Sequence, residues 1–290
     1  MPRELWALST EKMEIREYGM PELSEKQVLV RCEYGASKHG TEMAAVKGYG
    51  AERGRRDPDL GVFIPDDTFT GPEPTRVGNM YVGTVTHIGP GVTSLSEGDR
   101  VLDYGTFREV HVSHEDYCRK MPADLSWKSA VCLDPADFAM AAVRDGQVRI
   151  GDAVAVFGMG AIGLMVIQFA RLSGAEPVIA VDPLPNRRRA AELSGADLVF
   201  DPTACDVGVE IRKATGKQGV DVAIDYSGSV HAMQAALRSV AFGGNVVAGA
   251  YPPPYGAGLD LGAEAHLHIP NIIFSRACSE PNREHPRWNE

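Results

Sequence analysis

Residues 154–170 read VAVFGMGAIGLMVIQFA, and this stretch decides the fold of the second half of the chain. A short apolar run typical of a buried strand leads into Gly158, Gly160 and Gly163, and a helical pattern follows directly. The first glycine permits a tight turn, the second lets the backbone approach a pyrophosphate, and the third lets the helix pack close to the strand. A glycine-rich turn without a ligand is the alternative, but the flanking strand and helix favour dinucleotide binding.

The pyrophosphate is expected at the start of that helix, at Ala161 and Ile162, where free N–H groups and the helix dipole favour negative charge. About 20 residues on, at the position expected for an acidic residue, Asp182 ends the next apolar run, PVIAVD. A carboxylate there can bond both ribose hydroxyls and repels a 2′-phosphate, which predicts NAD over NADP. The arginines of NRRR at 186–189 leave NADP open, because one of them, Arg187, could hold a 2′-phosphate; otherwise they form a solvated helix start.

Length and composition narrow the class of protein. The chain has 290 residues, enough for two domains, with 44% hydrophobic and 23% charged residues, which is ordinary for a globular protein. A net charge of −10 argues against nucleic acid or an anionic membrane surface as a partner. The sequence has no apolar run of membrane-spanning length and no signal-peptide core. Five scattered cysteines without a CxxC pair indicate reduced thiols, so a cytoplasmic location is expected.

The pattern of apolar and polar residues changes near residue 145. The first half contains short alternating runs separated by turn signals, which predicts a small β-barrel or sandwich, and residues 48–77 are loop-like. The second half alternates apolar strands with helices, which predicts a parallel sheet with right-handed crossovers. The fold class is therefore α/β. The strands are expected in these runs: 27–34, 80–89, 99–105, 108–113, 153–157, 177–182, 197–201, 220–228, 245–251 and 271–274.

The order of these parts resembles the medium-chain dehydrogenase/reductase superfamily, which includes zinc alcohol, polyol and sugar dehydrogenases and zinc-free quinone and enone reductases. The resemblance covers nearly the whole chain. Its matching stretches are GNMYVGTVTHIGPGVTSLSEGDRV, GDAVAVFGMGAIGLMVIQFARLSGA, VDPLPNRRRAAELSGAD, GVDVAIDYSG and FGGNVVAGAY.

This resemblance implies a GroES-like β-barrel catalytic domain over residues 1–144 and a Rossmann dinucleotide-binding domain, a doubly wound parallel sheet, over 145–276. It also implies an active-site cleft between them and a homodimer. Residues 277–290 are expected to form a C-terminal segment that is short compared with the family. The cofactor after the later strands is expected to be lined by Ser227, Gly228, Gly249, Ala250 and Tyr251.

The stretch SKHGTE at 37–42 departs from the zinc-dependent pattern of that superfamily. His39 stands where the family has a cysteine ligand, while Thr41 keeps the proton-relay hydroxyl and Glu42 the neighbouring carboxylate. Asn79 and Met80 replace the His-Glu pair of the next ligand position, and neither is a normal zinc donor. Only His39 and a third position, Asp134, could then bind a metal, and a catalytic zinc normally has three protein ligands. The four-cysteine lobe of a structural zinc is also absent. We therefore expect a zinc-free enzyme.

Without zinc, side chains must take the alcohol proton and polarise the developing carbonyl. His39 is the main candidate because imidazole titrates near neutral pH; a capping or surface histidine is the alternative. Thr41 could relay the proton and Glu42 could orient the relay. Tyr49 and Asp134 are further candidates, while His111 and His114 flank a strand end and are expected to be exposed.

The predicted function is hydride transfer between NAD(H) and a secondary alcohol or ketone, such as a sugar, polyol or secondary metabolite. One alternative is a zinc-free reductase of enones or quinones, in which hydride reaches the carbon beside a carbonyl and Tyr49 gains importance. The other is a non-catalytic dinucleotide-binding protein that senses redox state. The identity of the substrate lies in loops that follow no readable rule.

Overall fold

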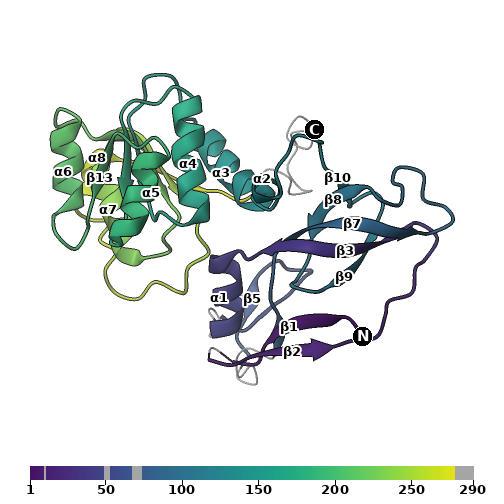
Figure 1. The fold of residues 1–290 in the computed structure, drawn as a ribbon. Coiled ribbons are helices and arrows are strands. Elements are labelled where there is room, and N and C mark those ends of the chain that lie inside the picture. The colour runs from purple at the N-terminus through teal and green to yellow at the C-terminus, as the bar shows by residue number, and fades with distance from the viewer. Residues whose placement is uncertain (10, 49–52, 67–73, 278–290) are drawn as a thin grey trace. The chain divides into compact units, whose positions relative to one another are not determined.

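The computed structural model describes residues 1–9, 11–48, 53–66 and 74–277 of the chain. The chain divides into two compact units, Met1–Leu133 and Asp134–Glu290 (Figure 1). The division comes earlier than the boundary at residue 144 that the sequence pattern suggests, because helix α3 (Leu133–Asp145) packs into the core of the second unit through Ala139, Ala142 and Val143. None of the helices in the described ranges has the length and hydropathy that crossing a bilayer requires.

The first unit is built from antiparallel strands. Its largest sheet has the strand order β10-β8-β7-β3-β9, and a second sheet has the order β2-β1-β6. The elements of this unit are β1 (Arg3–Ala7), β2 (Met13–Glu17), β3 (Gln27–Ala36), α1 (His39–Lys47), β4 (Arg55–Arg56), β5 (Phe63–Ile64), β6 (Thr75–Arg76), β7 (Met80–Ile88), β8 (Arg100–Tyr104), β9 (Val110–His114), β10 (Arg119–Lys120) and α2 (Trp127–Ala130).

Apolar side chains pack on both sides of the first unit's large sheet, and one of these sides is the interior between β3, β7 and β8. Val28 and Val30 of β3 are fully buried, and they pack with Val85 of β7 and Val101 of β8. The inward side also carries polar residues. His111 is only 5% exposed, so the expectation that it lies on the surface is wrong. Its ring stacks on Tyr81 at a centroid distance of 3.7 Å, since the odd positions of β9 face inward.

The second unit is a six-stranded parallel sheet with the order β13-β12-β11-β14-β15-β16. The order runs outward in opposite directions from β11 and β14, which is the doubly wound arrangement of a Rossmann fold. The elements after α3 are β11 (Val154–Phe157), α4 (Ala161–Leu172), β12 (Val178–Val181), α5 (Pro185–Leu193), β13 (Leu198–Phe200), α6 (Val207–Ala214), β14 (Val220–Asp225), α7 (Val230–Ser239), β15 (Val240–Ala248), α8 (Glu264–His268) and β16 (Asn271–Phe274).

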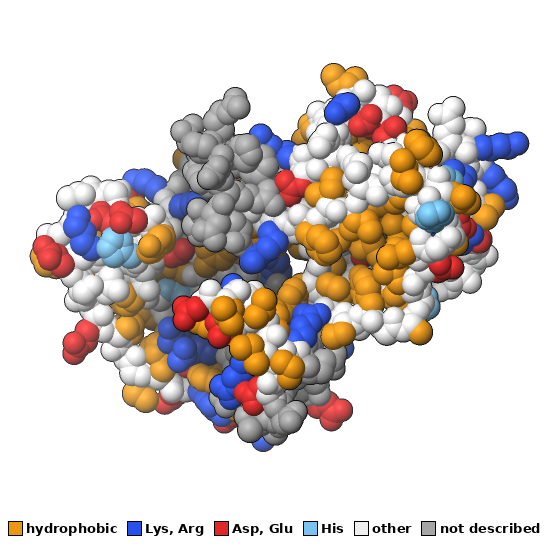
Figure 2. Space-filling model, turned by 180° about the vertical axis from the view of Figure 1, so that it is seen from behind, with side chains coloured by type: hydrophobic (Ala, Val, Ile, Leu, Met, Phe, Trp, Pro, Cys, Tyr) orange, Lys and Arg blue, Asp and Glu red, His pale blue; other side chains and the backbone are white. Residues whose placement is uncertain are grey.

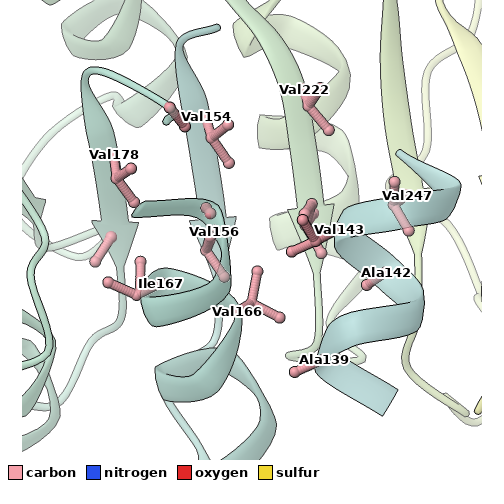
Figure 3. Close-up of a cluster of buried hydrophobic side chains, with 14 of the residues drawn as sticks. Ala139, Ala142, Val143, Val154, Val156, Val166, Ile167, Val178, Val222 and Val247 are labelled. Carbon is pink, nitrogen blue, oxygen red and sulfur yellow. The ribbon is translucent and has the colours of Figure 1, made fainter. Parts of the chain in front are cut away.

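Helices cover both faces of this sheet. Figure 3 shows one face, where Val166 and Ile167 of α4 and Val143 of α3 lie over side chains of β11, β12, β14 and β15. A second cluster on the opposite face includes Ile211 of α6 and Leu237 of α7. The central strands are buried on both sides, which explains why their sequences are continuous apolar runs without alternation. Each fully buried Val, Leu or Ile side chain contributes about 1.5–3 kcal/mol of burial free energy.

Candidate functional site

The three glycines after β11 form the elbow that the sequence predicts. Gly158 has φ of +91°, and a Cβ added there would lie 2.7 Å from the backbone nitrogen of Ser227. A Cβ on Gly163 would lie 2.0 Å from the carbonyl oxygen of Gly158, so α4 starts against the turn itself. Both positions therefore require glycine for reasons of backbone geometry and packing.

Gly160 differs from the other two glycines, because a Cβ added to it would meet no atom within 4 Å. Gly160 is the N-cap of α4, and no side chain caps the helix there. The N–H groups of the first turn, which begins at Ala161 and Ile162, are therefore available to an anion, as a dinucleotide pyrophosphate requires. The open space over a glycine at a twelve-residue helix start is the observation that fits a dinucleotide to this site.

Asp182, directly after β12, is 2% exposed and is fixed by backbone donors. Its Oδ2 accepts the N–H of Met159, inside the glycine elbow, at 2.8 Å, and its Oδ1 accepts the N–H of Leu184 at 2.8 Å. This carboxylate therefore joins the end of β12 to the elbow and places negative charge there.

Two of the arginines at 186–189 contact this strand end. Arg187 Nη1 lies 3.6 Å from Asp182 Oδ2, and its side chain is 41% exposed. Arg188 Nη1 donates to the carbonyl oxygen of Asp182 at 2.8 Å and forms an ion pair with Asp201 at 2.9 Å. Arg188 is therefore occupied inside the protein, while Arg187 stands beside the carboxylate at the surface.

The turn after β14 forms the other wall of the elbow. Ser227 donates both its N–H and its Oγ–H to Asp225 Oδ1, at 2.8 and 2.6 Å. Gly228 follows with φ of +70°. The N–H groups of Gly249 and Ala250, after β15, donate to the carbonyl oxygen of Asp225 at 3.0 and 3.2 Å.

The predicted cofactor residues after β14 and β15 are thus brought together at the carboxyl edge of the sheet. A Cβ on Gly249 would lie 2.4 Å from the ring of Tyr226, so this glycine permits close packing. Tyr251 is 64% exposed. The arrangement joins the elbow, Asp182, Ser227 and Gly249 in one region, where open α/β sheets bind their ligands.

The polar corner at 37–42 lies at the start of α1. Glu42 Oε1 accepts the N–H of Lys38 at 2.7 Å, and the Glu42 N–H donates to the carbonyl oxygen of Lys38 at 3.0 Å. This carboxylate therefore satisfies a donor at the helix start. The side chains of His39 and Thr41 lie outside what the structure describes, and Tyr49 lies outside the described residues altogether.

Two of the residues at the expected zinc positions, Met80 and Asp134, are buried. Met80 is 1% exposed and packs in an apolar cluster with Val82, Leu102 and Met121, so its thioether is part of the core. Asp134 is 5% exposed and belongs to α3 in the second unit. Across the side chains that the structure describes, no three His, Cys, Asp or Glu residues come together as a metal site would need.

Sequence reasoning missed Asp225, which proves to be the most buried carboxylate of this region, at 1% exposure. Burial raises its pKa to about 6. The available signal was an acidic residue ending the apolar run VDVAID immediately before the Ser-Gly turn, in the same place that Asp182 occupies after its own strand.

Comparisons with known proteins agree with this geometry. The family model described as zinc-binding dehydrogenase matches residues 161–277. The D-guloside 3-dehydrogenase of Escherichia coli (strain K12) is 43% identical over 281 residues, which cover 94% of this chain and 80% of that protein. The (R,R)-butanediol dehydrogenase of Bacillus subtilis (strain 168) is 32% identical over 64% of this chain and 62% of its own length.

Solved structures share the fold. The 2R,3R-butanediol dehydrogenase of Bacillus subtilis superposes with a TM-score of 0.77 at 23% identity, covering 96% of this chain and 84% of that one. A zinc-binding dehydrogenase from Sinorhizobium meliloti 1021, bound to NADP, gives the same TM-score, identity and coverage. The predicted α/β architecture, with a GroES-like unit and a Rossmann unit, is confirmed, and so is the predicted enzyme class, a dehydrogenase or reductase. The chain belongs to the medium-chain dehydrogenase/reductase superfamily.

Proposed function

We propose that this enzyme transfers hydride between NAD(H) and a secondary hydroxyl group of a sugar glycoside or polyol, without zinc. The observation that carries the proposal is the glycine elbow with open space over Gly160, in a chain 43% identical to a D-guloside 3-dehydrogenase. In the oxidative direction the carbinol C–H bond breaks, its hydride moves to the nicotinamide, and the hydroxyl proton goes to a base. The cofactor supplies the hydride chemistry, and the protein supplies binding, orientation and the base.

The choice of NAD over NADP rests on Asp182. Its carboxylate is held at the end of β12 by the N–H groups of Met159 and Leu184, so it cannot turn away from a 2′-phosphate at low cost. Arg187, 3.6 Å away, offsets part of the charge and is the residue that would favour NADP. Titration with NADH and NADPH tests the choice: tighter binding of NADH is expected, and tighter binding of NADPH would overturn it.

The proton chemistry is assigned to the corner at the start of α1. His39 is the proposed base, because a neutral imidazole can accept the hydroxyl proton near neutral pH. Thr41 is the proposed relay and Glu42, which holds the helix start through Lys38, the residue that orients it. Tyr49 and Asp134 are retained as further candidates for contact with substrate.

Substitution of His39 tests this assignment. We expect His39→Ala to lower kcat by about 100-fold or more, since general-base catalysis typically contributes 10²–10⁴-fold, with little change in NADH affinity. The measurements are steady-state kinetics with a panel of glycosides and polyols, and NADH titration by fluorescence. A variant with normal kcat would remove His39 from the mechanism.

A screen of substrates separates the competing functions. Glycosides and polyols are tested with NAD, and enones and quinones with NADH, each followed by NADH absorbance. Turnover of the hydroxyl compounds is expected. Turnover of enones alone would identify a reductase, and NADH binding without any turnover would identify a redox sensor.

The proposal of zinc independence rests on the buried, apolar setting of Met80 and on Asn79 at the neighbouring position. Elemental analysis of purified, active enzyme tests it. Activity is expected to survive dialysis against a chelator with less than stoichiometric zinc. One tightly held zinc per chain, lost together with activity, would contradict the proposal.

We further propose that the enzyme is a homodimer. The support is β16, an edge strand of the parallel sheet on which Ile272 is 45% and Phe274 82% exposed. Figure 2 shows a broad field of hydrophobic side chains on the second unit, seen from behind. Exposed apolar edges of this kind mark association surfaces.

A further inference from the structure

A buried carboxylate that the proton chemistry does not use lies beside the glycine elbow. Asp225 ends β14, and both hydrogen bonds from Ser227 go to its Oδ1. Its Oδ2 is buried and has no hydrogen-bond partner among the residues that the structure describes. A buried polar atom without a partner is rare in folded proteins and needs a reason.

The position of Asp225 in the sheet provides that reason. Strands β11 and β14 pair in parallel, and Asp225 lies opposite Phe157, the residue before Gly158. The strand order reverses between these two strands, so a dinucleotide crosses the sheet edge here. The β11–β13 half carries Asp182 for the adenosine ribose, and the β14–β16 half therefore receives the nicotinamide. Asp225 belongs to the nicotinamide half of the site.

The two redox forms of the cofactor differ by one charge in this half. The nicotinamide ring of NAD⁺ is a cation, whereas that of NADH is neutral. A buried negative charge is poorly screened by solvent and salt, so it acts on the ring even without direct contact. We propose that the Asp225 carboxylate is a specificity-determining residue of the cofactor site and selects oxidised over reduced dinucleotide. This inference rests on the dinucleotide site of the proposed function.

The same charge would oppose hydride transfer to the bound ring but favour release of the reduced product. It stabilises the positively charged ring before hydride transfer and loses that interaction once the ring is neutral. The product NADH is then held less tightly than NAD⁺ was. The Oδ2 atom has no hydrogen-bond partner among the described residues. Its proposed contribution is long-range attraction, which needs the charge and not a hydrogen bond.

The charge state of Asp225 gives the selection a pH dependence. Burial raises its pKa to about 6, so the group is ionised at about pH 8 and largely neutral at about pH 5. Binding of a cation favours the ionised form, so NAD⁺ affinity should rise as the pH rises through about 6, while NADH affinity stays level.

Within the part of the chain that the structure describes, the residues paired with Asp225 on the adjoining strands carry no charge. Strands β11 and β15 bring the uncharged Phe157 and Ala248 against it. Tyr255, from the segment after β15, is the titratable group that interacts with it, and burial and then the Asp225 charge raise the pKa of that phenol further above neutrality. His231, on α7, is exposed to solvent.

The test is to measure the dissociation constants of NAD⁺ and NADH for wild type and Asp225→Asn from about pH 5 to about pH 8. Asparagine is similar in size and keeps an oxygen for the Ser227 donors. At about pH 8 the variant should lose on the order of tenfold in NAD⁺ affinity and less than about twofold in NADH affinity. Its NAD⁺ affinity should no longer depend on pH.

Asp221→Asn is the matched control, because Asp221 is an exposed carboxylate at the amino end of the same strand. It should leave the ratio of NAD⁺ to NADH affinity unchanged. Equal loss of both cofactors in Asp225→Asn would show a purely structural role and overturn the inference. A wild-type affinity ratio that is flat across this pH range would overturn it without any variant. If wild type binds neither cofactor, the proposed function itself fails.

Discussion

Gly158 and Gly160 stand two positions apart in one turn, but the structure places different demands on them. Gly158 is required by its own backbone, with φ of +91° and Ser227 packed against its Cα. Gly160 has an ordinary φ of −79° and open space around it. The first therefore serves folding and the second serves the ligand.

Alanine at each position separates these roles. Gly158→Ala should lower the free energy of unfolding by about 1–3 kcal/mol, because the new Cβ meets backbone at a strained φ. Gly160→Ala should leave that free energy within about 0.5 kcal/mol of wild type, or slightly raised, and weaken NADH binding by about tenfold or more, because the Cβ takes the space of the pyrophosphate. Thermal unfolding and NADH titration measure both. A Gly160→Ala enzyme with normal NADH affinity would place the pyrophosphate elsewhere.

At the scale of single residues, a role that depends on neighbouring positions in the sequence could be predicted. A role that depends on contacts with distant strands could not. The glycines follow from turn chemistry within a few positions of the chain. Asp182 could be predicted because it ends an apolar run at the expected spacing. Asp225 also ends an apolar run, but its significance depends on its burial and on pairing with β11, and neither is written in the residues around it.

Strand β9 shows the limit of sequence patterns at the level of an element. Its residues alternate between apolar and polar, and the sequence favours the valines as the inward side. The structure buries the other set: His111 and Ser113 face inward, while Val110 and Val112 are only half-buried. The face is chosen by partners on other strands, because Tyr81 of β7 supplies a ring for His111 to stack on.

This burial makes the stability of the first unit depend on pH. Burial lowers the pKa of His111 to about 4, from 6.5 in an unfolded chain. The folded state therefore favours the neutral ring, and its contribution is present above the unfolded pKa and lost as pH falls toward the folded one. Through this histidine, wild type should lose up to about 3 kcal/mol of unfolding free energy between neutral pH and about pH 4. His111→Phe, which keeps an aromatic ring over Tyr81, should not show that loss.

Urea unfolding at several pH values measures this dependence. His87→Phe is the control, because His87 is an exposed histidine on β7, the strand that also carries Tyr81, and this variant should keep the wild-type dependence. If His111→Phe loses stability with pH as steeply as wild type does, the buried histidine is not the group responsible.

For the whole molecule, the alternation of strands and helices predicted the second unit well. All six of its strands were predicted, five of them within three residues at each end, since strands buried on both faces read as continuous apolar runs. Strand β15 begins five residues before the predicted run. The first unit was predicted less completely. Strand β2 exposes four of its five residues, and in β1 the buried Glu4 interrupts the apolar pattern, so no pattern marked either strand. The boundary between units depends on what α3 packs against, which is a tertiary property.

The proposed dimer follows from the edge of the parallel sheet. Strand β16 is short, and Phe274 at its end is 82% exposed. Exposure of such a large apolar side chain to water is unfavourable for a monomer. Two copies related by a twofold axis could pair these edges and cover the phenylalanines. Phe274→Glu should therefore give monomers, because two carboxylates would be buried against each other. Light scattering with size-exclusion chromatography measures the mass. Leu172→Glu, at an equally exposed position on α4, should remain dimeric. A wild-type monomer, or a dimer that survives Phe274→Glu unchanged, would rule out this edge as the interface.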